Sequence, residues 1–298
     1  MNSILVAALA GLGGMLGWGF ADFFAKKTID QIGDVTTLFW GQLIGIVPLV
    51  ILFFVKPDVP HLTGSQWIWL CVLGVWSGLS YIPTYVAFGK GKVSLLSPIF
   101  ASYAVVVAIL SAVLLKEVVP PARWLAFVIV FVGVIFINGD ADTFRSIFGR
   151  SRTSERMGVA GLKEILLAIC LYSVWLIALD QFINGRYWVP LLLVIRIFSA
   201  LSLLAYASAR HVRLAVRRPG IWKYLVLIGV FDVAAFAAVS FGFSNTNYTS
   251  VVAMLSGAFS LPTIILAHLF LKERMTRTQA LGAAVSVGGI MLVYALGS

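Results

Sequence analysis

Apolar runs of about twenty residues follow one another along almost the whole chain, separated by short polar connections. A helix needs roughly 20 apolar residues to cross the hydrocarbon layer of a bilayer, so 298 residues accommodate about ten such helices and no soluble domain. Only helices fit, because the strands of a membrane barrel alternate in polarity and these runs do not. The sequence therefore predicts an all-α polytopic membrane protein with spans at about 4–25, 35–55, 66–88, 94–115, 122–138, 162–183, 188–208, 221–243, 249–271 and 277–296.

The composition excludes several other classes of protein. Hydrophobic residues make up 60% of the chain and charged residues only 11%, which is more apolar than a soluble protein of this length. The net charge of +10 does not indicate nucleic-acid binding, because the basic residues lie in short connections between apolar runs. Cys71 and Cys170 lie apart within apolar runs, so we expect neither a disulfide nor a metal site, and no cofactor. The N-terminal run is expected to be a retained first span.

An internal repeat relates the two halves of the chain. Ser94–Glu117 aligns with Ser250–Glu273 at a constant offset of 156 without a gap, and both segments end in Leu-Lys-Glu. The longest polar stretch, 139–161, separates predicted repeats at 1–138 and 162–298. Each repeat holds an odd number of spans, so the second enters the membrane from the opposite side. Such inverted repeats are characteristic of secondary transporters, whose site lies near the midplane between the halves.

Five-span repeats whose fourth span ends in Leu-Lys-Glu resemble the drug/metabolite transporter superfamily, specifically its ten-helix EamA-like branch. The resemblance covers essentially the whole chain, through the number and spacing of the spans and both Leu-Lys-Glu ends. It implies ten helices around a central cavity, which export or exchange small metabolites, such as amino acids, by alternating access. The substrate stays open among amino acids, aromatic metabolites, nucleobases, sugars and cationic drugs.

Other functions receive less support from the sequence. It contains no HExxH, GxSxG, paired-histidine or Walker motif, so we expect neither an enzyme nor direct use of ATP. An ion or solute gradient would then drive transport, with protons as the candidate coupling ion. A passive channel, facilitator or lipid scramblase is the alternative, although no repeated filter sequence supports it. The expected partners are a small-molecule substrate and the lipid bilayer, and the chain is expected to act as a monomer or homodimer.

The distribution of basic residues predicts the orientation in the plasma membrane. With both termini outside, the outer loops hold only Lys56, Lys116, Arg123 and Arg186. The positive-inside rule favours this orientation. Members of the resembled family are commonly drawn with cytoplasmic termini, so the resemblance and the charges disagree. The proposed cytoplasmic set is Lys26, Lys27, Lys90, Lys92, Arg145, Arg150, Arg152, Arg156, Lys163, Arg210, Arg213, Arg217, Arg218, Lys223, Lys272, Arg274 and Arg277.

The first span carries a candidate face of the solute pathway. Trp18, Asp22 and Lys26 follow one another at four-residue intervals and therefore share one side of the helix. Ionisable side chains within a span are costly, so each is a candidate functional group. Two interpretations stay open: Asp22 forms an intrahelical pair with Lys26, or Asp22 and Trp18 line the pathway.

The sixth span carries an acidic residue in the position that corresponds to Asp22. Asp180 is as far from the start of its span as Asp22 is from its own, and inversion would place the two carboxylates toward opposite membrane faces. They would then act as gates or proton sites, although solvation at the helix end is the favoured interpretation of Asp180. Packing is favoured for Tyr172 and Trp175, and we keep Trp175 as a candidate contact.

Charged residues also occur deep in the seventh and eighth spans. At 1.5 Å of rise per residue, Arg196 and Asp232 lie at nearly the same depth in the membrane. They are therefore predicted to meet as a buried ion pair. The pair would be either a structural staple or a clamp for a substrate carboxylate. Asp22 and Asp232 are the candidate proton carriers. For His268, near the end of the ninth span, a helix-end role is favoured.

Tyrosines flank prolines in the third and fourth spans. Tyr81 and Tyr85 lie one turn apart around Pro83, and Tyr103 follows Pro98. A proline frees backbone carbonyls that only a cavity or a neighbour can satisfy. Aromatic rings at such places are suited to line a pocket for an organic solute and to hold a cationic group. The predicted substrate-binding set is therefore Trp18, Asp22, Tyr81, Tyr85, Tyr103, Trp175, Arg196 and Asp232.

Overall fold

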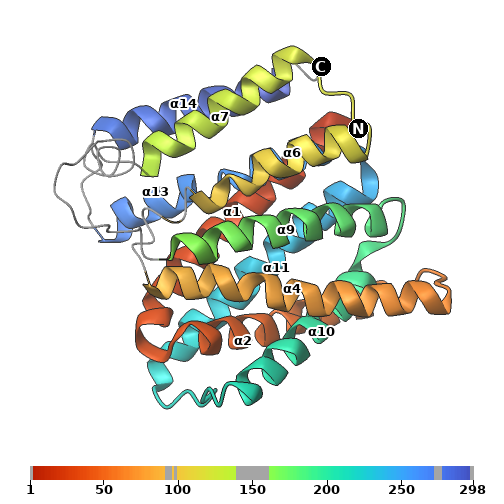
Figure 1. Cartoon of the computed structure of the whole chain (residues 1–298), viewed down its shortest axis with the longest axis vertical. Coiled ribbons are helices and arrows are strands. Elements are labelled where there is room, and N and C mark those ends of the chain that lie inside the picture. Colours follow the sequence, from red (N-terminus) through yellow and green to blue (C-terminus); the bar gives the residue numbers. More distant parts are fainter. Residues whose placement is uncertain (1–2, 91–95, 97–98, 139–160, 272–276, 296–298) are drawn as a thin grey trace.

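The computed structural model describes residues 3–90, 96, 99–138, 161–271 and 277–295, and all the secondary-structure elements in these ranges are helices, joined by short irregular connections (Figure 1). The described helices of the first half are α1 (Ser3–Ile32), α2 (Asp34–Ile44), α3 (Ile46–Val55), α4 (Gly64–Lys90), α6 (Tyr103–Leu114) and α7 (Pro121–Asn138). Those of the second half are α9 (Leu162–Ile183), α10 (Trp188–Ala209), the 3₁₀ turn η1 (Pro219–Ile221), α11 (Trp222–Asn245), α12 (Thr249–Gly257), α13 (Ser260–Leu271) and α14 (Arg277–Ala295).

The predicted all-α membrane fold is confirmed, with several differences in the helices. In the described residues, six elements are long and apolar enough to cross a membrane, and four shorter apolar helices occupy the remaining predicted spans. The second predicted span is divided at Gly45, where an added β-carbon would lie 3.2 Å from the carbonyl oxygen of Gly229 on α11. The ninth is divided between α12 and α13, and α1 continues to Ile32 rather than ending near residue 25.

The two halves are inverted repeats. In Figure 1, α1 runs away from the end of the bundle that carries both termini, whereas its counterpart α9 runs toward that end. The helix contacts have the matching symmetry: α1 packs on α11 and α12, as α9 packs on α4 and α6. The fifth spans of the two halves, α7 and α14, pack on each other. The chain therefore contains two five-span units that interlock around a common centre.

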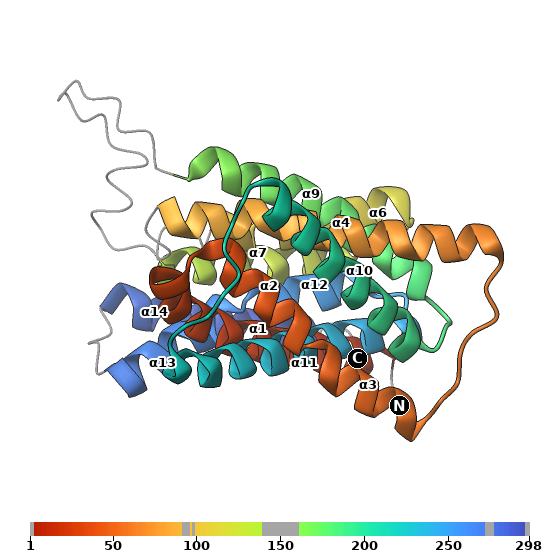
Figure 2. The ribbon, with the colours of Figure 1, turned by 90° about the horizontal axis from the view of Figure 1, so that it is seen from below.

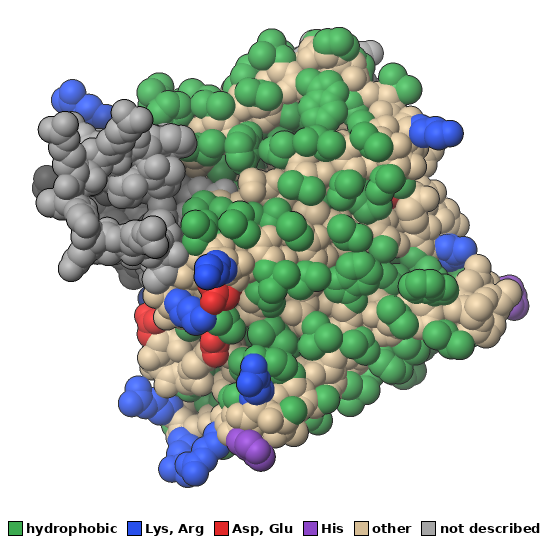
Figure 3. Space-filling model, in the orientation of Figure 1, with side chains coloured by type: hydrophobic (Ala, Val, Ile, Leu, Met, Phe, Trp, Pro, Cys, Tyr) green, Lys and Arg blue, Asp and Glu red, His purple; other side chains and the backbone are tan. Residues whose placement is uncertain are grey.

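The helices of both halves alternate within the bundle. Figure 2 shows α2, α10 and α11 side by side, and α2 contacts both of the others. Large apolar side chains cover much of the face shown in Figure 3, while charged side chains gather toward its edges. An exposed apolar surface of this extent is stable in lipid. The buried polar residues therefore define the interior of the bundle.

Candidate functional site

A small pocket lies between the two repeats, at the centre of the bundle. Its open volume is only about 20 Å³, which is room for about one water molecule. Helices α1 and α4 of the first repeat and α9 and α11 of the second supply most of its walls. The pocket is therefore nearly filled by its own side chains in this conformation. Its lining residues are Trp18, Ala21, Asp22, Tyr81, Thr84, Tyr85, Phe100, Tyr103, Tyr172, Asp232 and Phe259.

Tyr172 lies at the centre of the aromatic part of the wall. Its ring contacts Tyr103 and Tyr81 edge to face, with centroids 4.9 and 5.3 Å away. Trp18 contacts the same ring in the same manner at 6.3 Å. Edge-to-face contacts fix ring orientations, so these four aromatic side chains from three predicted spans of the first repeat and one of the second form a rigid wall.

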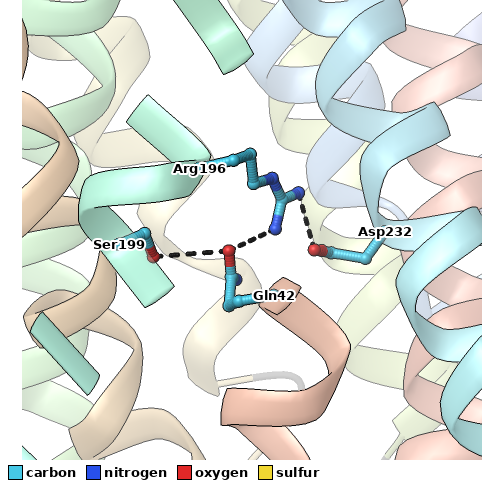
Figure 4. Close-up of polar contacts among 4 residues, drawn as sticks. All are labelled: Gln42, Arg196, Ser199 and Asp232. Atoms are coloured by element: carbon cyan, nitrogen blue, oxygen red, sulfur yellow. Dashed lines mark hydrogen bonds and ion pairs between the residues drawn. The ribbon is translucent and has the colours of Figure 1, made fainter. Parts of the chain in front are cut away.

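An ion pair stands at the side of the pocket. Nη2 of Arg196 on α10 lies 2.7 Å from Oδ2 of Asp232 on α11, and Nη1 donates a hydrogen bond to Oε1 of Gln42 on α2 (Figure 4). Ser199 donates to the same amide oxygen at 3.3 Å. The guanidinium also lies over the ring of Phe236, 4.6 Å from its centroid. The predicted meeting of Arg196 and Asp232 is therefore confirmed.

Three other polar side chains of the pocket lack a hydrogen-bond or ion-pair partner among the described residues. Nε1 of Trp18 and Oγ1 of Thr84 are buried and make no hydrogen bond in the described part of the chain. Asp22 lines the pocket, and no described cation lies within ion-pair distance of its carboxylate. Buried polar groups are normally satisfied, so an indole N–H, a hydroxyl and a carboxylate here are suited to a ligand.

The structure brings together most of the residues singled out in the sequence. Six of them line the pocket: Trp18, Asp22, Tyr81, Tyr85, Tyr103 and Asp232. Trp175 and Arg196 form a layer behind it. The ring of Trp175 stacks on Tyr172 at 5.6 Å, and its Nε1 donates to the carbonyl oxygen of Leu73 at 2.8 Å. Each of these two residues touches a lining side chain, Tyr172 and Asp232 respectively.

Sequence reasoning missed part of the site. Tyr172 was assigned to packing, yet it lines the pocket, and neither Thr84 nor Phe259 was singled out. Thr84 lies between the two predicted tyrosines, and this position is the signal in the sequence that points to it. Gln42 is an amide in an otherwise apolar span, and this was the available sign that it bonds to a buried charge.

Asp180, for which solvation at a helix end was favoured, is only 1% exposed, so that interpretation is wrong. The side chains of Lys26 and His268 lie outside the described residues, as does most of the predicted linker 139–161. Within the described residues, no group of three or more His, Cys, Asp or Glu side chains is arranged to hold a metal ion.

The repeats match a known family of membrane proteins. The family model described as the EamA-like transporter family matches residues 5–139 and again residues 160–295. The chain belongs to the EamA-like transporter family. Each of the two family matches covers one predicted repeat, so the EamA-like unit occurs twice in this protein. Membership makes the chain a multi-pass membrane transporter and not an enzyme.

Comparison of the whole structure agrees with this assignment. A solved structure titled "Crystal structure of protein" superposes with a TM-score of 0.75 at 14% identity, and covers 97% of this chain and 98% of that one. At this identity the likeness concerns the fold alone. No curated protein matches the sequence significantly. The substrate of this EamA-like transporter must therefore be argued from its own residues.

Proposed function

We propose that this EamA-like transporter is a secondary carrier that moves small organic metabolites by alternating access. The observation that most supports this proposal is the small pocket between two inverted repeats, with aromatic walls and unpartnered polar groups. Inverted repeats that rock around a fixed midplane site are the usual basis of alternating access. The residues proposed to contact the solute are Trp18, Asp22, Tyr81, Tyr85, Tyr103 and Asp232, with Trp175 and Arg196 positioning them.

The charges of the pocket favour a solute with a protonated amine, such as an amino acid or a related compound. Arg196 is already engaged by Asp232 and Gln42, so it is poorly placed to receive a solute carboxylate. Asp22 has no described cationic partner, and aromatic rings surround the same space. A carboxylate beside aromatic faces is a favourable environment for an organic cation.

We further propose that protons drive this transport. Asp22 would bind either a proton or the solute's ammonium group, so that each would leave when the other arrives. Asp232 is less suited to this role because its carboxylate is held by Arg196 at 2.7 Å. The protein would reside in the plasma membrane with both termini outside, as the basic residues of the sequence predict.

Counterflow in proteoliposomes tests this proposal. Vesicles loaded with unlabelled 2-phenylethylamine should take up the labelled compound transiently and with saturation, whereas vesicles loaded with neutral 2-phenylethanol should not. Phenylethylamine is chosen because it joins an ammonium group to an aromatic ring. Uptake that rises linearly with concentration and is not stimulated by internal solute would support a passive channel, facilitator or scramblase and overturn the carrier proposal.

A further inference from the structure

A second, larger polar pocket lies at the end of the bundle that carries both termini. Its volume is about 730 Å³. The ends of α6, α9 and α11 and the start of α12 form its walls, and the same helices or their direct continuations also line the central pocket. Its principal polar residues are Glu117, Asp180, Gln181, Asn184, Asn245 and Thr249.

Asp180 is the unusual group in this polar pocket. Asp180 is only 1% exposed, and Oδ1 makes no hydrogen bond of normal geometry in the described part of the chain, although the hydroxyl of Thr249 interacts with the carboxyl group. The other oxygen accepts a hydrogen bond from Nε2 of Gln181 at 3.3 Å. Among the described residues, no cation lies within ion-pair distance of this carboxylate. A buried carboxylate with a free oxygen is costly, which indicates that a ligand completes its surroundings.

The second acid of the polar pocket, Glu117, already has hydrogen-bond partners. Glu117 accepts hydrogen bonds from the backbone N–H of Ser250, at 2.9 Å, and from the hydroxyl of the same residue, and it thereby caps the start of α12. Lys116 lies at the exposed rim, and no ion pair joins it to Asp180. Of the two acids in the polar pocket, Asp180 is therefore the one that no backbone N–H and no described cation engages.

The repeat relates Asp180 to Asp22. Each lies 18 residues after the start of its predicted span, at 162 and 4. On α9, Asp180 follows Tyr172 of the central pocket by 8 residues, or about 12 Å along the helix axis. Helix α9 therefore carries one wall of the central pocket and the free carboxylate of the polar pocket. The two repeat-related carboxylates therefore line two different pockets, and helix α9 contributes to both.

We propose that the polar pocket is a second solute site, at the mouth of the pathway, where Asp180 receives the protonated amine of the solute. Gln181, Asn184 and Thr249 offer the amide and hydroxyl groups that would surround it. The site would concentrate cationic solutes beside the central pocket before the bundle opens. This inference rests on the proposed function for the choice of a cationic solute, but the binding site itself can be tested without transport.

Protection of a cysteine tests the site directly in the full chain. In a background of Cys71→Ser and Cys170→Ser, Asn245→Cys places one thiol in the wall of the polar pocket. We expect 2-phenylethylamine to slow labelling by a membrane-impermeant maleimide at least fivefold. Asp180→Asn should raise the half-protecting concentration about tenfold, whereas Asp58→Asn, an exposed carboxylate outside the pocket, should leave it unchanged.

A second variant keeps the test decisive if Asp180→Asn does not fold. Gln181→Lys, at an exposed position next to Asp180, should supply a competing ammonium group and abolish protection. The inference is overturned by equal protection from neutral 2-phenylethanol, sodium chloride or potassium chloride. It is also overturned if Asp180→Asn matches Asp58→Asn, or if Gln181→Lys is still protected. Protection without any counterflow of the amine would refute the proposed function and leave this site standing.

Discussion

The guanidinium of Arg196 lies between the carboxylate of Asp232, 2.7 Å away, and the amide oxygen of Gln42. Arg196 and Asp232 belong to the second repeat, whereas Gln42 belongs to the first. The hydrogen bond from Arg196 to Gln42 therefore joins the two halves of the bundle at the side of the central pocket, while the ion pair orients one of the two pocket carboxylates. The sequence leaves two roles open for this pair, a structural staple and a clamp for the substrate. The two roles predict different behaviour of the variants.

Breaking the pair should reduce both stability and transport. Asp232→Asn leaves the guanidinium of Arg196, which is 2% exposed, without a counter-charge. Loss of one partner of a buried pair costs about 3–5 kcal/mol. We therefore expect a lower melting temperature in detergent as well as reduced counterflow. A variant that melts normally but transports poorly would instead assign Asp232 to proton coupling, and one that is normal in both would remove it from the site.

Removing both charges is the matched control for this prediction. The double variant Arg196→Leu with Asp232→Leu leaves no uncompensated charge, and such replacements of buried pairs are often neutral or stabilising. Its melting temperature should recover to near that of the unmodified protein. Counterflow should stay low, because the pocket would lose a carboxylate that faces the solute.

Asp22 should be required for transport but not for folding. In Asp22→Asn the side chain keeps its size and loses the charge that we propose to receive the solute, and no described ion pair is broken. Charged hydrogen bonds contribute about 1.5–3 kcal/mol, so the half-saturation concentration for 2-phenylethylamine should rise at least about tenfold. Asp30→Asn, an exposed carboxylate on the same helix, is the control. Normal counterflow in Asp22→Asn would exclude Asp22 from the site.

The contact between α1 and α11 should depend on a small residue at Gly17. A β-carbon there would lie 2.7 Å from both Cβ of Ala235 and the carbonyl oxygen of Phe231. Gly17→Val should therefore destabilise the protein by about 2–3 kcal/mol, measured by thermal unfolding. At Gly288, nothing lies within 4 Å of an added β-carbon. Gly288→Ala should be neutral or stabilising by about 0.5–1 kcal/mol, and equal effects at the two positions would contradict the packing.

The orientation can be read from a fusion at Ser298. Because both termini lie at one end of the bundle, a reporter at the C-terminus gives the side of both. With the termini outside, a fluorescent protein secreted through the bacterial translocation machinery should stay dark, whereas a periplasmic phosphatase fusion should be active. Bright fluorescence with an inactive phosphatase would place the termini in the cytoplasm and refute the charge-based orientation.

The inverted architecture was predictable because span length and the odd number of spans per repeat follow from bilayer thickness and simple counting. The Arg196–Asp232 pair was predictable because helical rise gives the depth of each charge. The break at Gly45 depends on how closely α2 approaches the backbone of Gly229, which no local pattern records. The place of Tyr172 in the pocket wall was not predictable for a related reason. Periodicity indicates that a residue faces inward, but not whether its side chain meets a neighbouring helix or a pocket.

Alternating access at the central pocket predicts that a thiol placed there reacts with reagents from each side of the membrane in turn. Thr84→Cys, in the background of Cys71→Ser and Cys170→Ser, replaces a 2% exposed pocket residue with a near isostere. An impermeant methanethiosulfonate should modify this cysteine in both right-side-out and inverted vesicles, and 2-phenylethylamine should slow both reactions. Modification from one side only, or from neither, would rule out alternating access at this pocket.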